Sequence, residues 1–248
     1  MTNPAASLKS VSHDALALEP AELAKIAKAY DAEPWWYDLR GLFILIFAYR
    51  STLWAQLRFF ARNIEAEHLE VAIGSGTLLD MVLRWRALRG APASRISGFD
   101  YAEAMLAGAA RRFRDRSDIA LHRADAAELP FSDDSFDSIN VANAVHCLPD
   151  IDGSLAEMFR VLRPGKCVAM NVLLEPRGWA PLRRLAERIN AWGQKKGILH
   201  SAYDVEDVQR RVRKVGFDQV TVEVMGNTCH LVAYKPVVAV QPAGRRAA

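Results

Sequence analysis

The chain has 248 residues, of which 51% are hydrophobic and 25% charged, and its formal net charge at pH 7 is +3. This length and apolar content suffice for one sizeable core, so we expect a single α/β domain rather than two full domains. The small net charge, without a dense Lys/Arg block among aromatic residues, argues against a nucleic-acid partner. Cys147, Cys167 and Cys229 are widely spaced, form neither a disulfide framework nor a zinc pattern, and suit a reducing compartment.

The first residues give no sign of a targeting segment. Residues 1–17 are small and polar and lack the basic-then-apolar order of a signal peptide, so we expect a disordered arm and a cytoplasmic protein. The apolar run over residues 41–49 lies between Arg40 and Arg50 and is well short of the ~20 residues that a spanning helix needs. We therefore expect no transmembrane segment.

Residues 20–61 predict two helices that join at Glu33-Pro34. Trp36 and Tyr37 open the second helix, which is rich in apolar side chains up to Phe60. These aromatic residues either cap the core or line a pocket for an apolar ligand, and so apolar a helix also fits docking on a lipid surface. All three interpretations stay open at this point.

A short apolar strand, a turn of small residues and a helix come next. Small residues at Ala72, Gly74 and Gly76 let the backbone approach a ligand, and the helix N-terminus offers free N–H groups to an anionic group. The dinucleotide fingerprint would place its third glycine at Leu79, where a bulky side chain opposes close packing, so a plain NAD fold is disfavoured. Glu70, inside the strand, favours a ligand that carries a cation and an amino group.

This stretch resembles the first motif of the class I S-adenosylmethionine-dependent methyltransferases, which reads roughly D/E-x-G-x-G-x-G. Here it reads E-V-A-I-G-S-G, with Ala72 in place of the first glycine. Alanine leaves room for the ligand but is less comfortable than glycine where φ is positive. The resemblance implies a Rossmann-like fold with a doubly wound, seven-stranded, mainly parallel sheet. It also implies S-adenosylmethionine as the cofactor, with Glu70, Ala72, Gly74 and Gly76 as binding residues.

The sequence then predicts a helix over residues 78–88 and a strand over residues 95–100. The strand ends in Asp100, at the edge of an open parallel sheet where ligands bind. There the acid can accept hydrogen bonds from a ribose diol, from N–H groups at the start of the next helix, or from both. The surrounding segments G-F-D-Y (residues 98–101) and M-L (residues 105–106) resemble the family's second motif. This resemblance implies that Tyr101 and Met105 pack on the adenine.

Residues 119–122 predict the third strand, and the phrase R-A-D-A-A-E-L-P-F that follows closely resembles the family's third motif. By this resemblance the Asp125 carboxylate would bind the adenine amino group and the Ala126 N–H would address a ring nitrogen. One helix and one strand separate Asp125 from Asp100, which places both acids at neighbouring strand ends. An acidic loop that only caps a helix is the structural alternative.

Residues 138–142 predict the fourth strand, which ends close to Asn143 and His146. In the family, residues at this strand end lie beside the transferable methyl group. The resemblance therefore implies that Asn143 holds the methionine end of the cofactor and makes His146 a catalytic candidate that faces the acceptor. A packing role is the alternative for His146, because holding the acceptor in line can carry most of the acceleration without a general base.

Residues 151–162 predict a helix and residues 167–173 a fifth strand. The turn between them, R-V-L-R-P-G-K, resembles the R-V-L-x-P-G-G turn of the ubiquinone/menaquinone biosynthesis methyltransferase group, with Lys166 in place of the second glycine. The resemblance covers about residues 69–173, which is the cofactor half of the domain.

The expected domain spans residues 18–236, and its acceptor contacts must come from the segments that flank the recognisable motifs. Residues 18–62 are the expected helical cover, and residues 175–203 are an amphipathic, basic helical insertion where this family often places a substrate lid. An ordinary solvated helix is the alternative for that insertion. The candidate acceptor-binding residues are Trp36, Tyr37, His200 and Tyr203.

The end of the chain predicts a last helix over residues 204–215 and two closing strands over residues 219–225 and 229–234. Residues 237–248 are Ala/Arg-rich, and we expect a disordered tail.

These features predict an S-adenosylmethionine-dependent methyltransferase for a small, largely apolar acceptor, whose methyl-accepting atom can be oxygen, nitrogen, carbon or sulfur. A phospholipid N-methyltransferase in contact with a lipid surface is the nearest alternative, motivated by the apolar helix after Trp35 and the basic insertion. A non-catalytic nucleoside- or partner-binding protein is a third, although the intact Asp100 and Asp125 argue against a decayed site. The sequence contains no metal-ligand pattern.

Overall fold

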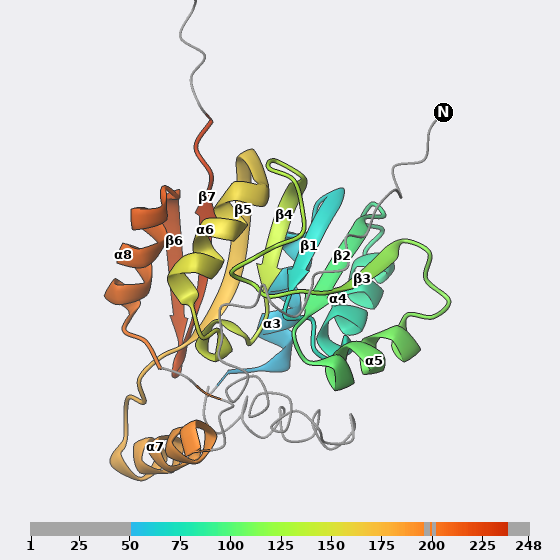
Figure 1. Ribbon diagram of the computed structural model, residues 1–248. Helices are drawn as coiled ribbons and strands as arrows, with labels where there is room; N and C mark the ends of the chain where they lie inside the picture. The colour runs from blue at the N-terminus through green and yellow to red at the C-terminus, as the bar shows by residue number, and fades with distance from the viewer. Residues whose placement is uncertain (1–50, 196–198, 200–201, 238–248) are drawn as a thin grey trace, which may run out of the picture.

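The computed structural model describes residues 51–195, 199 and 202–237. In this part of the chain one sheet has the strand order β3-β2-β1-β4-β5-β7-β6 and carries helices on both faces (Figure 1). The strands are β1 (Glu67–Val71), β2 (Arg95–Asp100), β3 (Ile119–Arg123), β4 (Phe136–Val141), β5 (Leu162–Leu173), β6 (Asp218–Met225) and β7 (Thr228–Tyr234). The helices are α3 (Leu53–Arg62), α4 (Thr77–Leu88), α5 (Glu103–Arg112), α6 (Ile151–Val161), α7 (Ala180–Lys195) and α8 (Val205–Val215), with a 3₁₀ turn, η3 (Val145–Cys147).

The strand order places a topological switch point between β1 and β4. The chain builds outward from β1 to β2 and β3, and then crosses back to lay β4 on the other side of β1. Strands β1 to β5 are parallel, whereas β7 runs antiparallel to both β5 and β6. Because ligands of open α/β sheets bind at the carboxyl edge beside such a switch point, this topology fixes where a site belongs. The predicted doubly wound, seven-stranded sheet is confirmed.

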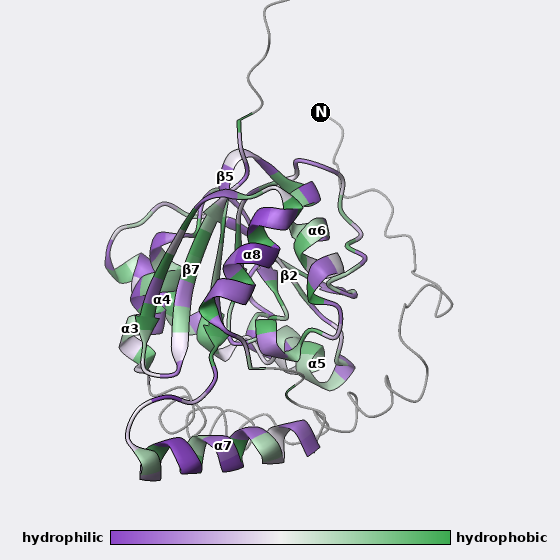
Figure 2. Ribbon diagram, turned by 90° about the vertical axis from the view of Figure 1, so that its left-hand side faces the viewer, coloured by the Kyte–Doolittle hydropathy of each residue, from purple (hydrophilic) through white to green (hydrophobic). Residues whose placement is uncertain are grey.

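Two hydrophobic clusters hold the helices against the sheet. On one face, Leu57 and Phe60 of α3 and Val82 of α4 pack with Ala169 and Val232 of the sheet. On the other face, Leu155 of α6 and Val208 and Val212 of α8 pack with Met170 and Leu231. Figure 2 shows α3 and α4 on one side of the strands and α6 and α8 on the other.

Local hydrogen bonds set the starts of two helices that border the site. The Thr52 side chain accepts a hydrogen bond from the Ala55 N–H at the start of α3, and Asp150 accepts one from the Gly153 N–H at the start of α6. Such N-caps satisfy N–H groups that have no partner within a helix. Helix α7 lies beyond the carboxyl edge of the sheet (Figure 1). Within the described residues, we find no helix that is both long and apolar enough to cross a membrane.

Within the described residues, the predicted elements agree with the structure in order and type, but several bounds differ. The predicted arm over residues 1–17, most of the predicted helical cover over residues 18–62 and nearly all of the predicted tail over residues 237–248 lie outside the described residues. Strand β5 begins at Leu162, five residues before the predicted start at Cys167. The predicted turn pairs instead as strand, because Leu162 is in register with Phe136 of β4 and the Gly165 N–H donates to the carbonyl of Lys235. The predicted insertion over residues 175–203 contains a shorter helix, α7.

The loop between β1 and α4 has backbone torsions that favour glycine. Ala72, Gly74 and Gly76 have φ values of 51°, 59° and 76°. A side chain at Gly76 would collide with the ring of Phe113, whereas a Cβ at Gly74 would meet no atom within 4 Å. Gly74 therefore leaves open space above the loop. The positive φ of Ala72 strains its backbone, because alanine has a Cβ that glycine lacks.

Replacing Ala72 with glycine should stabilise the protein by about 1 kcal/mol, because the relief of strain exceeds the added entropy of the unfolded chain. Urea denaturation measures this difference. Ala66→Gly is the matched control: Ala66 lies just before β1 and is not among the positive-φ residues, so this change should destabilise the protein by ~0.4–1 kcal/mol. Equal destabilisation in both variants would contradict the strain at Ala72.

Candidate active site

Asp100 joins the two loops that form the carboxyl edge at β1 and β2. Its Oδ2 accepts a hydrogen bond of 2.8 Å from the Gly74 N–H, and its Oδ1 accepts one of 2.8 Å from the Ala102 N–H. Burial raises the pKa of the Asp100 carboxyl, although the N–H groups of Ala102, Gly74 and Tyr101 act in the opposite direction. Each oxygen keeps a second lone pair, so the same carboxylate can also accept a hydrogen bond from a ligand hydroxyl.

Glu70 is buried on the face of β1 that α3 and α4 cover. Its Oε2 lies 3.1 Å from Nε2 of His68, and Nδ1 of His68 lies 2.7 Å from Oγ of Ser138 on β4. The Ser138 hydroxyl also accepts the Glu65 N–H. This chain of contacts explains how an acid is tolerated inside the central strand, since a buried charge needs a partner.

The predicted adenine-binding residues follow β2 and β3. Asp125 lies beyond the end of β3 and accepts a hydrogen bond from the Ala127 N–H, and Ala126 is buried beside it. Tyr101 is half-buried beneath the Arg123 guanidinium, whose central carbon lies 5.9 Å from the ring centroid. Met105 is fully buried in α5, so its contact with an adenine stays a prediction. The topology confirms that Asp100 and Asp125 follow adjacent strands.

Asn143, just after β4, is held by two pairs of reciprocal hydrogen bonds. Gln56 of α3 donates to its Oδ1 over 2.9 Å and accepts from its Nδ2 over 3.1 Å. Asn171 of β5 donates to the same Oδ1 and accepts from the Asn143 backbone N–H. These contacts fix Asn143 at a φ of 55°, a conformation that asparagine tolerates better than most residues. They also connect the cover helix α3 to the strand end predicted to lie beside the methyl group.

Gln56 and Asn171 were not among the predicted site residues. A usable signal was present at Asn171, because a polar side chain in an otherwise apolar buried strand needs a partner. No comparable signal marks Gln56, since glutamine is common on exposed helix surfaces and its 1% exposure appears only in the folded chain.

His146 lies in η3 and is 8% exposed. Burial lowers the pKa of His146 to about 4, so the imidazole is neutral at physiological pH. If the rate of methyl transfer changes with pH near neutrality, a group other than His146 must therefore be the one that titrates. A catalytic role for His146 stays a prediction.

The four predicted acceptor-binding residues fall into two groups. Trp36, Tyr37 and His200 lie outside the described residues. Tyr203 is buried and packs in the cluster that α6 and α8 cover, where its N–H donates to the carbonyl of Leu173. Burial raises the pKa of its phenol. An acceptor contact for Tyr203 stays a prediction.

Comparison with known proteins agrees with this geometry. Residues 69–170 match the family model described as a methyltransferase domain. Residues 69–170 thus form a methyltransferase domain that is similar to the class I S-adenosylmethionine-dependent methyltransferases. The matched residues run from β1 into β5 and include the loops around Gly74, Asp100, Asp125 and Asn143. The predicted resemblance is confirmed, and with it S-adenosylmethionine as the cofactor of the domain.

Two curated relatives that resemble this chain are methyltransferases named for quinone substrates. The demethylmenaquinone methyltransferase of Thermus thermophilus is 35% identical over 112 residues, which cover 44% of this chain and 49% of the relative. The 2-phytyl-1,4-naphtoquinone methyltransferase of Synechococcus elongatus is 32% identical over 124 residues, covering 49% and 51%. The chain thus spans about half the length of the curated relatives it matches.

A solved structure supports the fold beyond the matched domain. Phosphoethanolamine N-methyltransferase 2 of Haemonchus contortus, in complex with S-adenosyl-L-methionine, is similar with a TM-score of 0.60 at 18% identity. The alignment covers 77% of this chain and 56% of that protein. At this identity the similarity shows the fold alone.

Replacing Gln56 with leucine should lower the free energy of unfolding by ~1–3 kcal/mol, because Asn143 Nδ2 loses the partner that Gln56 provides in a partly buried environment. Chemical denaturation measures the loss. Gln194→Leu in α7 is the control: Gln194 is exposed, so its change should stay within about 0.5 kcal/mol. Similar small effects at both positions would show that the Gln56 contacts add no stability.

The buried neutral His146 should make stability fall on acidification. The unfolded imidazole titrates near pH 6.5 and the folded one at about pH 4. Between these values the unfolded state binds the extra proton, so the contribution is present above pH 6.5 and is lost as the pH falls toward 4. From pH 7 to pH 5 the expected loss is about 2 kcal/mol. His146→Gln should lose correspondingly less in denaturation at the two pH values, and an unchanged difference would disprove the assignment.

Proposed function

We propose that this protein transfers the methyl group of S-adenosylmethionine to a small, largely apolar acceptor of the quinone type, in its reduced, hydroxyl-bearing form. The observation that carries the proposal is the alignment of Glu70, Gly74, Asp100, Asp125 and Asn143 along the carboxyl edge from β3 to β4. The acceptor class comes from the names of the two curated relatives, which both act on quinones. The cytoplasm remains the expected compartment.

The described residues fit the cofactor. The open space above Gly74 admits a ligand close to the backbone, and the N-terminus of α4 follows directly. Asp100 has lone pairs left for the two ribose hydroxyls, and Asp125 offers an acceptor for the adenine amino group. Glu70 supplies negative charge on the side where we place the ammonium group of the methionine moiety.

The reaction needs the acceptor held in line with the bond that breaks. The cofactor supplies an electrophilic methyl group whose bond electrons leave with the sulfur. The chain must then position the nucleophilic atom and exclude water, and this positioning alone provides large accelerations. Asn143, fixed from two sides, would define the methyl end of the site, while α3 covers it through Gln56. A quinone ring is electron-poor, so its reduced form is the better nucleophile.

A phospholipid acceptor remains the second candidate because of the surface of α7. Trp179, just before α7, and Trp192 in it are 71% and 42% exposed. Leu182 and Leu185 are also exposed, and the same helix carries Arg184, Arg188 and Lys195. A helix with exposed apolar residues next to basic ones suits an anionic lipid surface.

A transfer assay with radiolabelled S-adenosylmethionine separates the two candidates. We expect labelled product with chemically reduced 2-phytyl-1,4-naphthoquinone and none with phosphatidylethanolamine vesicles. The opposite result would replace the quinone acceptor by the phospholipid, and no transfer to any acceptor, with the cofactor bound, would favour the non-catalytic interpretation.

The same preparation tests the cofactor site by calorimetry with S-adenosylhomocysteine. Asp100→Asn should weaken binding by ~1.5–3 kcal/mol, about 10- to 150-fold, because a charged hydrogen-bond acceptor is lost. Asp118→Asn is the matched control, since Asp118 precedes β3 at the opposite edge and pairs with Arg116. If both variants bind like the wild type, Asp100 has no part in the cofactor site.

A further inference from the structure

A stripe of buried polar side chains crosses the sheet on the face that α3 covers. Glu70 of β1 is in register with Asn140 of β4, and Asn140 with Ala169 of β5. Asn171 lies two residues beyond Ala169, on the same face of β5, and is in register with His230 of β7. A core built for stability alone would fill these positions with apolar side chains, because buried polar groups are costly unless they are paired.

Two members of this stripe, Asn140 and His230, have buried polar atoms without a hydrogen-bond partner among the described residues, and His230 is the one in register with Asn171. His230 is 3% exposed, and its Nε2 has no hydrogen-bond partner among the described residues. Its ring stacks on Phe59 of α3, with the centroids 4.2 Å apart and the planes 18° from parallel. Burial lowers the pKa of His230 to about 4, so the ring is neutral and Nε2 offers one hydrogen-bonding position.

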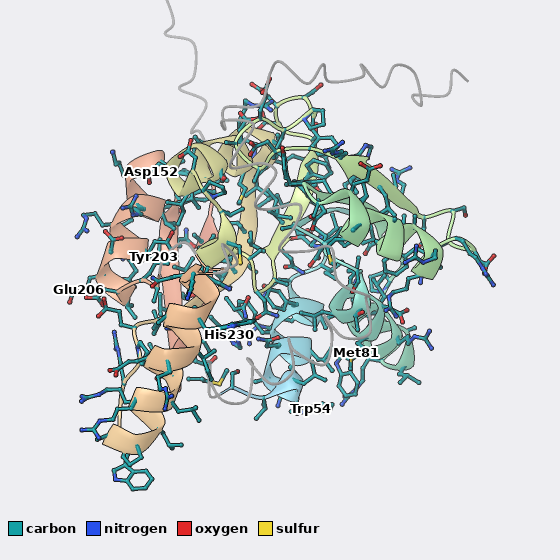
Figure 3. The ribbon with its side chains drawn as sticks, turned by 60° about the horizontal axis from the view of Figure 1, so that its bottom comes forward. Trp54, Met81, Asp152, Tyr203, Glu206 and His230 are labelled. Carbon is teal, nitrogen blue, oxygen red and sulfur yellow. The ribbon has the colours of Figure 1, made fainter. Side chains whose placement is uncertain are left out.

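The residues next to His230 also contact Asn143, which we place at the methyl end of the site. Its cross-strand neighbour Asn171 is bonded to Asn143, and Phe59 lies one helical turn from Gln56, which bonds to Asn143 as well. Figure 3, seen toward the carboxyl edge, draws His230 between α3 and α7. These are the elements that follow or cover the ends of β4 and β5.

We infer that His230 is an acceptor-binding residue whose Nε2 forms a hydrogen bond with a ring hydroxyl of the methyl acceptor. A hydroxyl both donates and accepts, so it fits Nε2 in either tautomer of the neutral imidazole. Because the face of the His230 ring stacks on Phe59, the ring edge, which carries Nε2, is the part of the side chain that is left to form a hydrogen bond. The inference rests on the proposed function and refines it, because it predicts selection for an acceptor that carries a free hydroxyl.

The test compares two acceptors in two enzymes. The acceptors are reduced 2-phytyl-1,4-naphthoquinone and its mono-O-methyl ethers, and the variant is His230→Phe, which keeps an aromatic ring to stack on Phe59 but lacks Nε2. The wild type should prefer the dihydroxy acceptor about tenfold in kcat/KM, the factor that corresponds to one hydrogen bond. In His230→Phe this preference should shrink to about one, while the affinity for S-adenosylhomocysteine stays unchanged.

Two further variants keep the test decisive. Tyr234→Phe removes a hydroxyl from the same face of β7, four residues from His230, and should keep the wild-type preference. His230→Gln restores a buried hydrogen-bonding group and should recover part of the preference. If His230→Phe does not fold, His230→Leu, which also lacks a hydrogen-bonding group, takes its place.

The outcomes separate the inference from the proposed function. An active wild type whose preference survives in His230→Phe overturns the inference alone and leaves Nε2 to a buried water molecule. A wild type that binds S-adenosylhomocysteine but methylates neither acceptor overturns the quinone proposal, and the inference with it.

Discussion

The amide network around Asn143 is the constraint on which the architecture of the site depends. Asn143 lies two residues after the end of β4 and takes a positive φ, so the chain turns sharply at the edge of the sheet. Gln56 and Asn171 satisfy its side chain from α3 and from β5. Directional bonds from two elements fix one conformation, whereas apolar packing tolerates several. The network thereby couples the position of the cover helix to the strand end where chemistry is expected.

Asp100 plays the corresponding part on the cofactor side. Its two oxygens bind the N–H groups of Gly74 and Ala102, so one carboxylate orders the loops after β1 and β2 together. The strained Ala72 is tolerated within this loop because neighbouring contacts determine its conformation. A rigid loop has no ordering cost left when a ligand arrives, which favours binding.

The sequence could predict that the candidate cofactor-binding residues lie at neighbouring strand ends, because each motif that contains them is a short contiguous segment. The motif around Gly74, the acid at Asp100 and the phrase around Asp125 each occupy one strand end, and parallel topology then brings the strand ends together. The polar contacts between α3 and the sheet were not predictable in this way. Gln56 and Asn143 are 87 residues apart, and neither has a sequence pattern that names its partner. The extended β5 was missed because its pairing with Lys235 is equally remote.

The distribution of unpaired polar atoms distinguishes the two faces of the sheet. The face under α6 and α8 has an apolar core, while the face under α3 carries Glu70, Asn140, Asn171 and His230. Among the described residues, Asn140 has both amide atoms without a partner, as His230 has its Nε2. Each such group costs ~1–3 kcal/mol of stability when buried. Natural sequences keep such costs mainly where a ligand or an ordered water molecule completes the hydrogen bonds. The α3 face therefore combines a structural core with a binding surface, and the helix that covers it contributes to both.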